Sequence, residues 1–457
     1  MKTIIKSTIV AAAFFVSFAA SAQTTRSGYF VDDYTYRFQL NPALGNSKNF
    51  VSMPALGNLN IGVNGNLHVT DILYNIDGRT TTFMNPGVDA SKFLNGLSDV
   101  NRLRVNTKID ILSAGFKAFG GYNTVNINAR ADIGVNLPKS VFSLLKEGVA
   151  NKTYAIDDLA ARAVAYAEIA FGHSRDINKE WRVGGTFKFL VGGGNIDVRL
   201  RNADLTLGQD AWTITSDAEI RSSLKGLSYQ TDVNDRTGHR YVSGAEVNGA
   251  GVGGFGMAFD LGAVYRPAVL KDWAFSVALL DLGFINWSNN MLASTDGPKT
   301  FNTDKYTFSV DDDSPNSFDN TWDKISDDIS AIYELDDMGD KGSRATALAA
   351  TLNVGAEYTF PLYRPLTFGL LNTTRINGAY TWTDFRLSAN VAPVKCFDAS
   401  ANIALGTFGF GFGWLMNVHL TGFNLFVGMD HTLGRVSKEF VPLSSNASVN
   451  FGLNFLF

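Results

Sequence analysis

The sequence is poor in charge, in cysteine and in long apolar runs. Charged residues make up 18% of its 457 residues, below the roughly 25% of typical soluble domains. The formal net charge is only −4, so nothing suggests a nucleic-acid binder and no nucleic-acid partner is expected. A single cysteine, Cys396, excludes an internal disulfide. Beyond the first twenty-odd residues, no apolar run is long enough for a membrane-spanning helix, which excludes a helical membrane protein.

The N-terminus has the features of an export signal. Lys2 and Lys6 precede an apolar stretch from Ile9 to Ala20, and Ala20-Ser21-Ala22 forms an A-x-A cleavage site. This order of a basic, an apolar and a small-residue region is typical of a secretory signal peptide. We expect residues 1–22 to be removed and the mature chain to be exported.

Apolar and polar residues alternate over many segments of the mature chain. In residues 122–137, Val125, Ile127 and Ala129 alternate with Asn126, Asn128 and Arg130. A period of two predicts a strand with one polar and one apolar face. The segments that follow this pattern are 59–70, 103–117, 122–137, 163–174, 181–191, 254–266, 272–287, 346–360, 366–374, 383–393, 397–407, 408–418, 422–431 and 446–457. The sequence therefore predicts about fourteen strands and an all-β fold.

The connections between these segments are sorted by length. Short ones, such as 119–121, 175–180, 361–365 and 419–422, alternate with long ones. The long connections are 71–102, 138–162, 192–253, 288–345 and 432–445. Short connections near 375–382 and 407 depart from the rule. Short turns on one rim and long loops on the other are typical of a bacterial outer-membrane barrel. We therefore expect residues 58–457 to form an antiparallel transmembrane β-barrel surrounded by outer-membrane lipid.

The strand ends and the C-terminus support the same fold. Aromatic residues next to the short turns predict a girdle at the membrane interface; they are Phe119, Tyr122, Trp181, Tyr265, Trp273, Phe360, Phe397 and Phe457. The final segment alternates from Val449 to Phe457. It resembles the C-terminal signal of outer-membrane proteins, which implies the barrel-assembly machinery as a partner and Phe457 as the signal residue.

Residues 23–57 lie between the signal peptide and the first clear strand and lack sustained alternation. We expect them to form a plug, or hatch, inside the barrel. They contain Asn41, Pro42, Ala43 and Leu44, and this segment resembles the Asn-Pro-Ala of the hatch in FadL-like outer-membrane transporters. PorV-like barrels of type IX secretion share that architecture. The resemblance implies a fourteen-stranded barrel from an uncharacterised family within this broad group. Its known members include channels for hydrophobic molecules.

Charged residues on the polar strand faces are expected to point into the lumen. They are Lys108, Asp110, Arg130, Asp132, Arg182, Lys188, Glu357 and Arg386. One interpretation is an ion-pair network that braces the wall and holds the plug; the other is a polar path for a ligand. Their mixed signs argue against strong ion selectivity.

The long loops contain apolar residues at helical spacing in residues 89–100, 140–149 and 322–335. Phe93, Leu94 and Leu97 are candidates for capturing a hydrophobic ligand at the outer rim. The alternative is that these helices pack on one another and cap the barrel. The acidic segment 311–340 leaves calcium binding and a solvated loop both open.

No catalytic, cofactor or metal motif is evident. The five histidines form no pair with metal-ligand spacing, so we expect no enzyme activity and no cofactor. Two functions remain: passive transport of a hydrophobic small molecule by a FadL-like route, or a PorV-like scaffold or shuttle for exported proteins. Transport predicts a continuous apolar cavity past the plug. A scaffold predicts a sealed lumen and an exposed apolar loop patch.

Overall fold

The computed structural model describes residues 25–76, 79–147, 152–156, 159–207, 212–234, 238–249, 251–295, 299–302, 334–431 and 446–457. The predicted signal peptide therefore lies outside the described residues. So do most of the predicted helix at 322–335 and most of the acidic segment 311–340.

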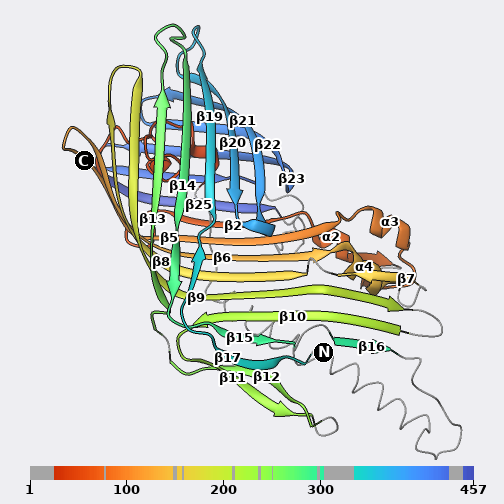
Figure 1. Ribbon diagram of the computed structural model, residues 1–457. Coiled ribbons are helices and arrows are strands. Elements are labelled where there is room, and N and C mark those ends of the chain that lie inside the picture. The colour runs from red at the N-terminus through yellow and green to blue at the C-terminus, as the bar shows by residue number, and fades with distance from the viewer. Residues whose placement is uncertain are drawn as a thin grey trace, which may run out of the picture.

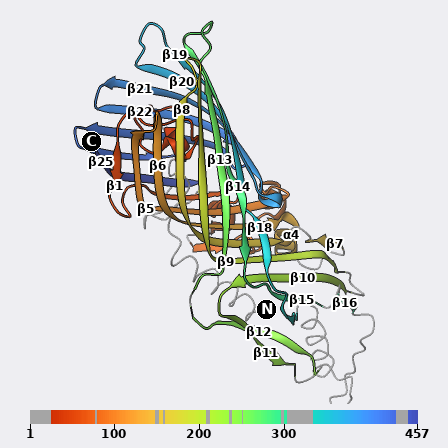
Figure 2. The same cartoon turned by 60° about the vertical axis from the view of Figure 1, so that its left-hand side comes forward.

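Fourteen antiparallel strands form a closed ring of hydrogen-bonded neighbours (Figures 1 and 2). The ring closes where Leu59 pairs with Phe451 on one side and with Ile109 on the other. Its first strand is interrupted and comprises β1 (Phe50–Ser52) and β2 (Leu59–Gly65). The others are β5 (Val100–Ala118), β6 (Gly121–Pro138), β8 (Ala160–Asp176), β9 (Trp181–Leu207), β13 (Gly254–Tyr265), β14 (Trp273–Trp287), β19 (Ala350–Thr359), β20 (Leu366–Ile376), β21 (Trp382–Val394), β22 (Phe397–Gly406), β23 (Gly409–Leu420), β24 (Phe423–Met429) and β25 (Ala447–Leu456). The predicted fourteen-stranded antiparallel barrel is confirmed.

The two rims of the barrel differ in their connections. Residues 119–120, 177–180, 266–272, 360–365, 395–396 and 421–422 connect strands at one end, the short-turn rim. The long connections lie at the other end, the long-loop rim. Phe50 pairs with Leu456, so β1 begins and β25 ends at the short-turn rim.

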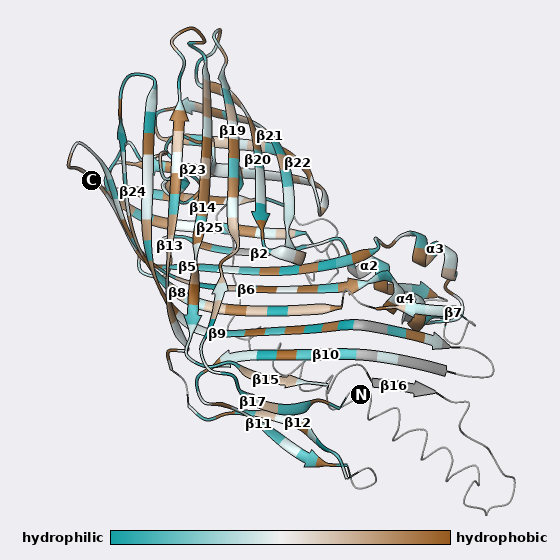
Figure 3. Cartoon of the chain, in the orientation of Figure 1, coloured by the Kyte–Doolittle hydropathy of each residue, from teal (hydrophilic) through white to brown (hydrophobic). Residues whose placement is uncertain are grey.

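The strand faces separate polar from apolar residues, as the alternating colours of Figure 3 show. On β13, Phe255, Met257, Phe259 and Leu261 are each between 44% and 56% exposed, whereas Asp260 is 3% exposed. An apolar outer face around a polar interior is the pattern of a barrel in lipid. Backbone hydrogen bonds around a closed ring also leave no strand edge unpaired, as the hydrocarbon region requires.

At the long-loop rim the wall continues into an extended sheet (Figures 1 and 2). Beyond Gly192, β9 leaves β13 and pairs with β10 (Trp212–Leu224), from Gly194 with Leu224 to Leu207 with Trp212. The smaller strands of this region are β7 (Lys152–Ala155), β15 (Met291–Ser294), β16 (Lys299–Asn302), β17 (Asp336–Asp340) and β18 (Arg344–Ala347). A separate hairpin consists of β11 (Leu227–Val233) and β12 (Arg240–Val247).

These strands correct the interpretation of residues 192–253 and 288–345 as loops alone. The extended part of β9 carries Asp197, Arg199 and Arg201 on alternate positions. Outside the lipid, neither face of such a strand must be apolar, so the apolar alternation that marks the barrel strands is lost.

A small loop core covers part of the long-loop rim. It comprises α2 (Val69–Ile72), β3 (Leu73–Ile76), β4 (Arg79–Thr82), α3 (Ala90–Asn95) and α4 (Lys139–Glu147). The Asp89 side chain accepts a hydrogen bond from the Lys92 backbone N–H and caps α3. None of the helices among the described residues is long and apolar enough to cross a membrane.

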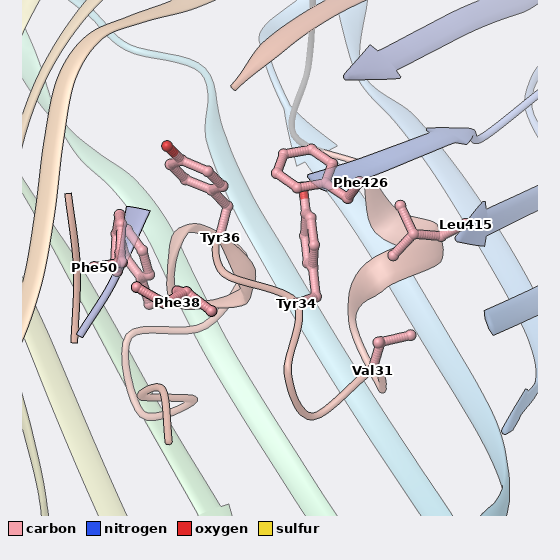
Figure 4. Packing of buried hydrophobic residues seen from close by; sticks show 8 residues of the cluster. Val31, Tyr34, Tyr36, Phe38, Phe50, Leu415 and Phe426 are labelled. Carbon is pink, nitrogen blue, oxygen red and sulfur yellow. The ribbon is translucent and has the colours of Figure 1, made fainter. Parts of the chain in front are cut away.

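Residues 25–49 form no strand and are largely buried among the barrel strands. They contain two short 3₁₀ helices, η1 (Arg26–Gly28) and η2 (Arg37–Gln39). Tyr34 and Tyr36 are completely buried, and their rings pack against Phe426 of β24 at 5.0 and 5.7 Å between centroids (Figure 4). Edge-to-face packing of this kind adds to the burial energy, and it attaches the N-terminal segment to the wall.

Candidate functional site

The Asn41–Leu44 turn contacts a part of the barrel wall where glycines leave the backbone uncovered by side chains. The Asn41 side chain donates to the backbone oxygens of Ala263 and Val277 at 3.4 and 3.3 Å, and its oxygen accepts from Ala43 N at 2.9 Å. Gly184 and Gly262 are register partners on β9 and β13. A Cβ at Gly262 would lie 2.0 Å from Asn41 Oδ1, and one at Gly184 would lie 2.4 Å from Pro42 O. Only glycines allow the turn to approach this closely.

A second attachment lies at the start of the described N-terminal segment. Asp430 accepts hydrogen bonds from the backbone N–H groups of Arg26 and Ser27 at 3.0 and 2.8 Å, and from the Ser27 hydroxyl at 2.8 Å. The Arg26 guanidinium pairs with Asp430 at 3.0 Å and with Asp384 at 2.8 Å. Arg386 pairs with Asp384 at 3.1 Å. The segment is therefore held by buried, charge-assisted hydrogen bonds, which are stronger than neutral ones.

Ion pairs fill the middle of the lumen. Arg130 of β6 contacts Asp281 of β14 through two hydrogen bonds of 2.9 and 3.0 Å, and it lies 3.1 Å from Glu168 of β8. Lys188 of β9 contacts Asp281 at 2.6 Å and Asp260 at 2.8 Å. Lys108 lies 3.6 Å from Glu168. Each charge faces one of opposite sign, as burial away from water requires.

Further polar contacts reach from wall to wall and from the wall to the N-terminal segment. Arg375 of β20 pairs with Asp132 of β6. Asp110 accepts hydrogen bonds from the Gln39 side chain at 3.2 and 3.4 Å. Arg182 pairs with Asp176 at 3.5 Å.

The alternation of the strands places all eight lumenal candidates on the inner face, including Glu357 and Arg386. The contacts described above suit the ion-pair interpretation, and the role of each residue stays a prediction.

A small vestibule opens among the wall residues near the long-loop rim. Its lining combines apolar groups, such as Val164 and Leu348, with the guanidinium groups of Arg104, Arg162 and Arg375. Arg104 lies over the Tyr380 ring at 4.6 Å and donates to Asn136 Oδ1 at 2.8 Å. The Arg162 guanidinium donates to Asn377 Oδ1 at 2.8 Å.

Within the described part of the chain, neither Arg104 nor Arg162 has an acidic partner, whereas Arg375 has Asp132. The vestibule therefore carries excess positive charge beside apolar surface.

The capture candidates lie in the loop core and not in this vestibule. Phe93, Leu94 and Leu97 are 3%, 9% and 7% exposed. The Phe93 ring stacks on Phe83 at 4.5 Å and meets Phe142 of α4 at 6.2 Å. The three side chains thus pack against other loop residues in this conformation. Their role in ligand capture stays a prediction.

The aromatic residues at the short-turn rim mostly face outward. Phe119, Trp181, Trp273 and Phe457 are 84%, 42%, 39% and 72% exposed. Tyr122 was wrongly assigned to the girdle: it is 2% exposed, and its hydroxyl donates to Lys48 O at 2.9 Å inside the barrel. It is the second residue of β6 and lies on the same face of the strand as Thr124 and Asn126.

Several lumenal charges were missed by the sequence interpretation. Glu168 and Asp260 alternate with outward apolar residues and could have been found by the same rule. Asp281 could not, because the register shifts here and its φ of +57° marks a bulge that reverses the alternation. The pair of Arg26 and Asp430 could not have been found either, because no local sequence pattern indicates a contact between residues 404 positions apart.

Comparison with known families gives one clear match. Residues 42–430 match the model of a "Family of unknown function (DUF5723)". The chain belongs to this family. The expectation of an uncharacterised family is therefore confirmed. The match begins at Pro42, the residue after Asn41, and covers most of the barrel. No functionally curated protein sequence matches the chain.

Solved structures similar to this DUF5723 barrel have low sequence identity to it. The toluene transporter TbuX of Ralstonia pickettii has a TM-score of 0.40 and 8% identity, over 93% of this chain and 94% of that chain. The toluene transporter TodX of Pseudomonas putida has a TM-score of 0.37 and 7% identity, over 96% and 94%. A FadL homologue of Pseudomonas aeruginosa has a TM-score of 0.36 and 10% identity, over 96% and 98%. The barrel assignment rests on the strand pairings and not on these scores.

Proposed function

We propose that this DUF5723 protein is a bacterial outer-membrane channel for passive transport of small hydrophobic molecules that carry an anionic group. The short-turn rim then faces the periplasm and the long-loop rim faces the exterior. The vestibule is the observation that carries the proposal. Val164 and Leu348 in its lining suit contact with an apolar group, and Arg104 and Arg162 supply cations without an acidic partner among the described residues. Guanidinium groups suit carboxylate and other oxyanion ligands.

The route beyond the vestibule requires a conformational change. The middle of the lumen is polar and is crossed by the contacts of Arg130, Asp281 and Arg375. This polar lumen differs from the continuous apolar cavity expected of a channel for hydrophobic molecules. Passage would therefore require the ion pairs and the N-terminal segment around Asn41–Leu44 to move together. This segment is then the plug of the channel. The solute increases the population of the open state because it binds the open state more tightly than the closed state.

The first experiment is native mass spectrometry on the protein extracted gently from its own outer membrane. A retained small amphipathic anion would support the proposal and give its chemical class. We expect R104Q/R162Q to lose this ligand, whereas R364Q should retain it. Arg364 is a matched control because it forms an exposed pair with Asp272 outside the vestibule.

Uptake into proteoliposomes of a fatty carboxylate and of the corresponding neutral alcohol tests the role of charge. Faster uptake of the carboxylate that disappears in R104Q/R162Q would support the vestibule. Equal uptake of both by all variants would contradict it.

A PorV-like scaffold or shuttle for exported proteins, including type IX secretion components, is the second candidate. The bridged lumen and the sheet that extends beyond the barrel at β9 and β10 favour it. Co-extraction of an exported protein at fixed stoichiometry, with no small ligand, would support this candidate. Removal of the β11–β12 hairpin, residues 227–247, should then release the partner without unfolding the barrel.

A further inference from the structure

Three parts of the fold bring a histidine and two carboxylates together at the short-turn rim. Asp33 belongs to the N-terminal segment, Asp398 is the second residue of β22, and His419 lies near the end of β23. His419 Nε2 lies 2.9 Å from Asp398 Oδ2 and 3.6 Å from Asp33 Oδ2. The three ligand atoms all lie within 4.8 Å of one another.

The surroundings hold these groups in place but leave one atom unsatisfied. Asn417 donates to Asp398 Oδ2 at 2.9 Å and to the Asp33 backbone oxygen at 3.0 Å. Ser47 Oγ donates to Asp33 Oδ1 at 2.5 Å. His419 is 4% exposed, yet its Nε2 makes no hydrogen bond of acceptable geometry despite the two nearby carboxylates. A buried ring nitrogen whose nearest carboxylate oxygen, at 2.9 Å, is misaligned for a hydrogen bond needs an explanation.

We propose that Asp33, Asp398 and His419 bind a divalent transition-metal ion, with Zn²⁺ as the best-matched member of the class. Metal bonds of about 2.0–2.2 Å place neighbouring ligand atoms roughly 2.8–3.6 Å apart in octahedral or tetrahedral geometry. The two spacings from Nε2 agree with this. One imidazole nitrogen with two carboxylate oxygens is a donor set that suits Zn²⁺ and its neighbours. The ion would join the N-terminal segment directly to the wall.

In the present conformation, the position of Lys48 disfavours binding of a metal ion to His419. Its Nζ lies 3.1 Å from His419 Nδ1, whereas a metal-bound histidine normally donates its second N–H to an acceptor. The lysine must therefore turn away when the metal binds, which its four-carbon side chain allows. Removing its charge should strengthen metal binding.

The test uses the full-length mature protein in detergent, stripped with EDTA and titrated with Zn²⁺ against a chromophoric competitor. We expect one Zn²⁺ per chain. H419Q and D398N should each bind at least about tenfold more weakly, and K48M about threefold more tightly. H173Q is the matched control: His173 also lies near the short-turn rim, where its Nδ1 is 2.9 Å from Asn123 Oδ1. Its affinity should be unchanged.

Heat-dependent electrophoretic mobility identifies folded barrels, so only variants that retain the folded form are compared. Substoichiometric binding by the wild type would overturn the proposal. So would wild-type affinity in H419Q, or an equal loss in H173Q. Weaker binding by K48M would also overturn it, because Lys48 would then support His419 and not compete with the ion.

Discussion

Arg375 on β20 and Asp132 on β6 form an ion pair across the lumen from nearly opposite walls. Around the ring the order is β6, β8, β9, β13, β14, β19 and β20, so six of fourteen steps separate them. The side chains are only 9% and 22% exposed, and water therefore screens their attraction weakly. The pair holds the two walls together at the vestibule, whose lining includes both residues.

R375Q should weaken the contact between the two walls and increase leakage through the barrel. If the pair contributes about 1.4 kcal/mol to the closed state, its loss raises the open population about tenfold. Liposome swelling in small sugars measures the change. The charge-swapped variant D132R/R375D should return swelling toward the wild-type rate. A barrel whose R375Q variant swells no faster than the wild type would show that this pair does not limit passage.

G262A should displace the Asn41–Leu44 turn, because the new Cβ would lie 2.0 Å from Asn41 Oδ1. Overpacking of this kind typically costs about 1–3 kcal/mol. Limited trypsin digestion should then cleave faster after Arg37 and Lys48. G185A is the matched control, since its Cβ would come no closer than 3.6 Å to Asp260 O. Equal protection in G262A and G185A would contradict the close fit.

D430N should release the start of the N-terminal segment. The change removes a charge that accepts from Arg26 and Ser27, and breaking one partner of a buried ion pair costs about 3–5 kcal/mol. Arg26 keeps Asp384, so we expect the lower end of that range. The temperature at which the barrel loses its folded electrophoretic mobility measures the effect. D272N, which removes an exposed pair with Arg364, should change it little.

His239 should titrate above its ordinary range. Its hydrogen bond to Glu334, at 2.8 Å, and its contact with Asp336, at 2.7 Å, raise the pKa of this histidine from the usual 6.5. The protonated contact therefore stabilises the β12 region below about pH 6.5, and this contribution is lost as the pH rises through the raised folded value. NMR titration of labelled histidines should show it, with H239Q for assignment. E334Q should lower the pKa; an unchanged value would contradict this cause.

All fourteen wall strands could be predicted, because the lipid imposes one rule on each of them. A residue such as Phe259 must be apolar where it faces hydrocarbon, whereas Asp260 can be charged where it faces the lumen. Outside the lipid this rule no longer applies. The extension of β9 around Arg199 therefore has no comparable signal and was interpreted as a loop.

The site was less accessible from sequence for a different reason. Alternation gives the face of a residue such as Arg130 or Lys188, but it does not give the partner across the lumen. The Arg130–Asp281 contact depends on how the ring closes and on the bulge at Asp281. The contact of Arg26 with Asp430 likewise depends on where the N-terminal segment folds back.

If the long-loop rim faces the exterior, as proposed, the length of β9 determines how far the molecule reaches from the membrane. Its 27 residues exceed the roughly 9–11 that cross the hydrocarbon core. At about 3.3 Å per residue, the remainder can extend up to about 50 Å past the lipid. A phage, an antibody or a neighbouring cell would therefore contact the extended part of β9 before it contacts the mouth of the barrel. Sequence variation imposed by such encounters should be concentrated on this extended part and spare the wall.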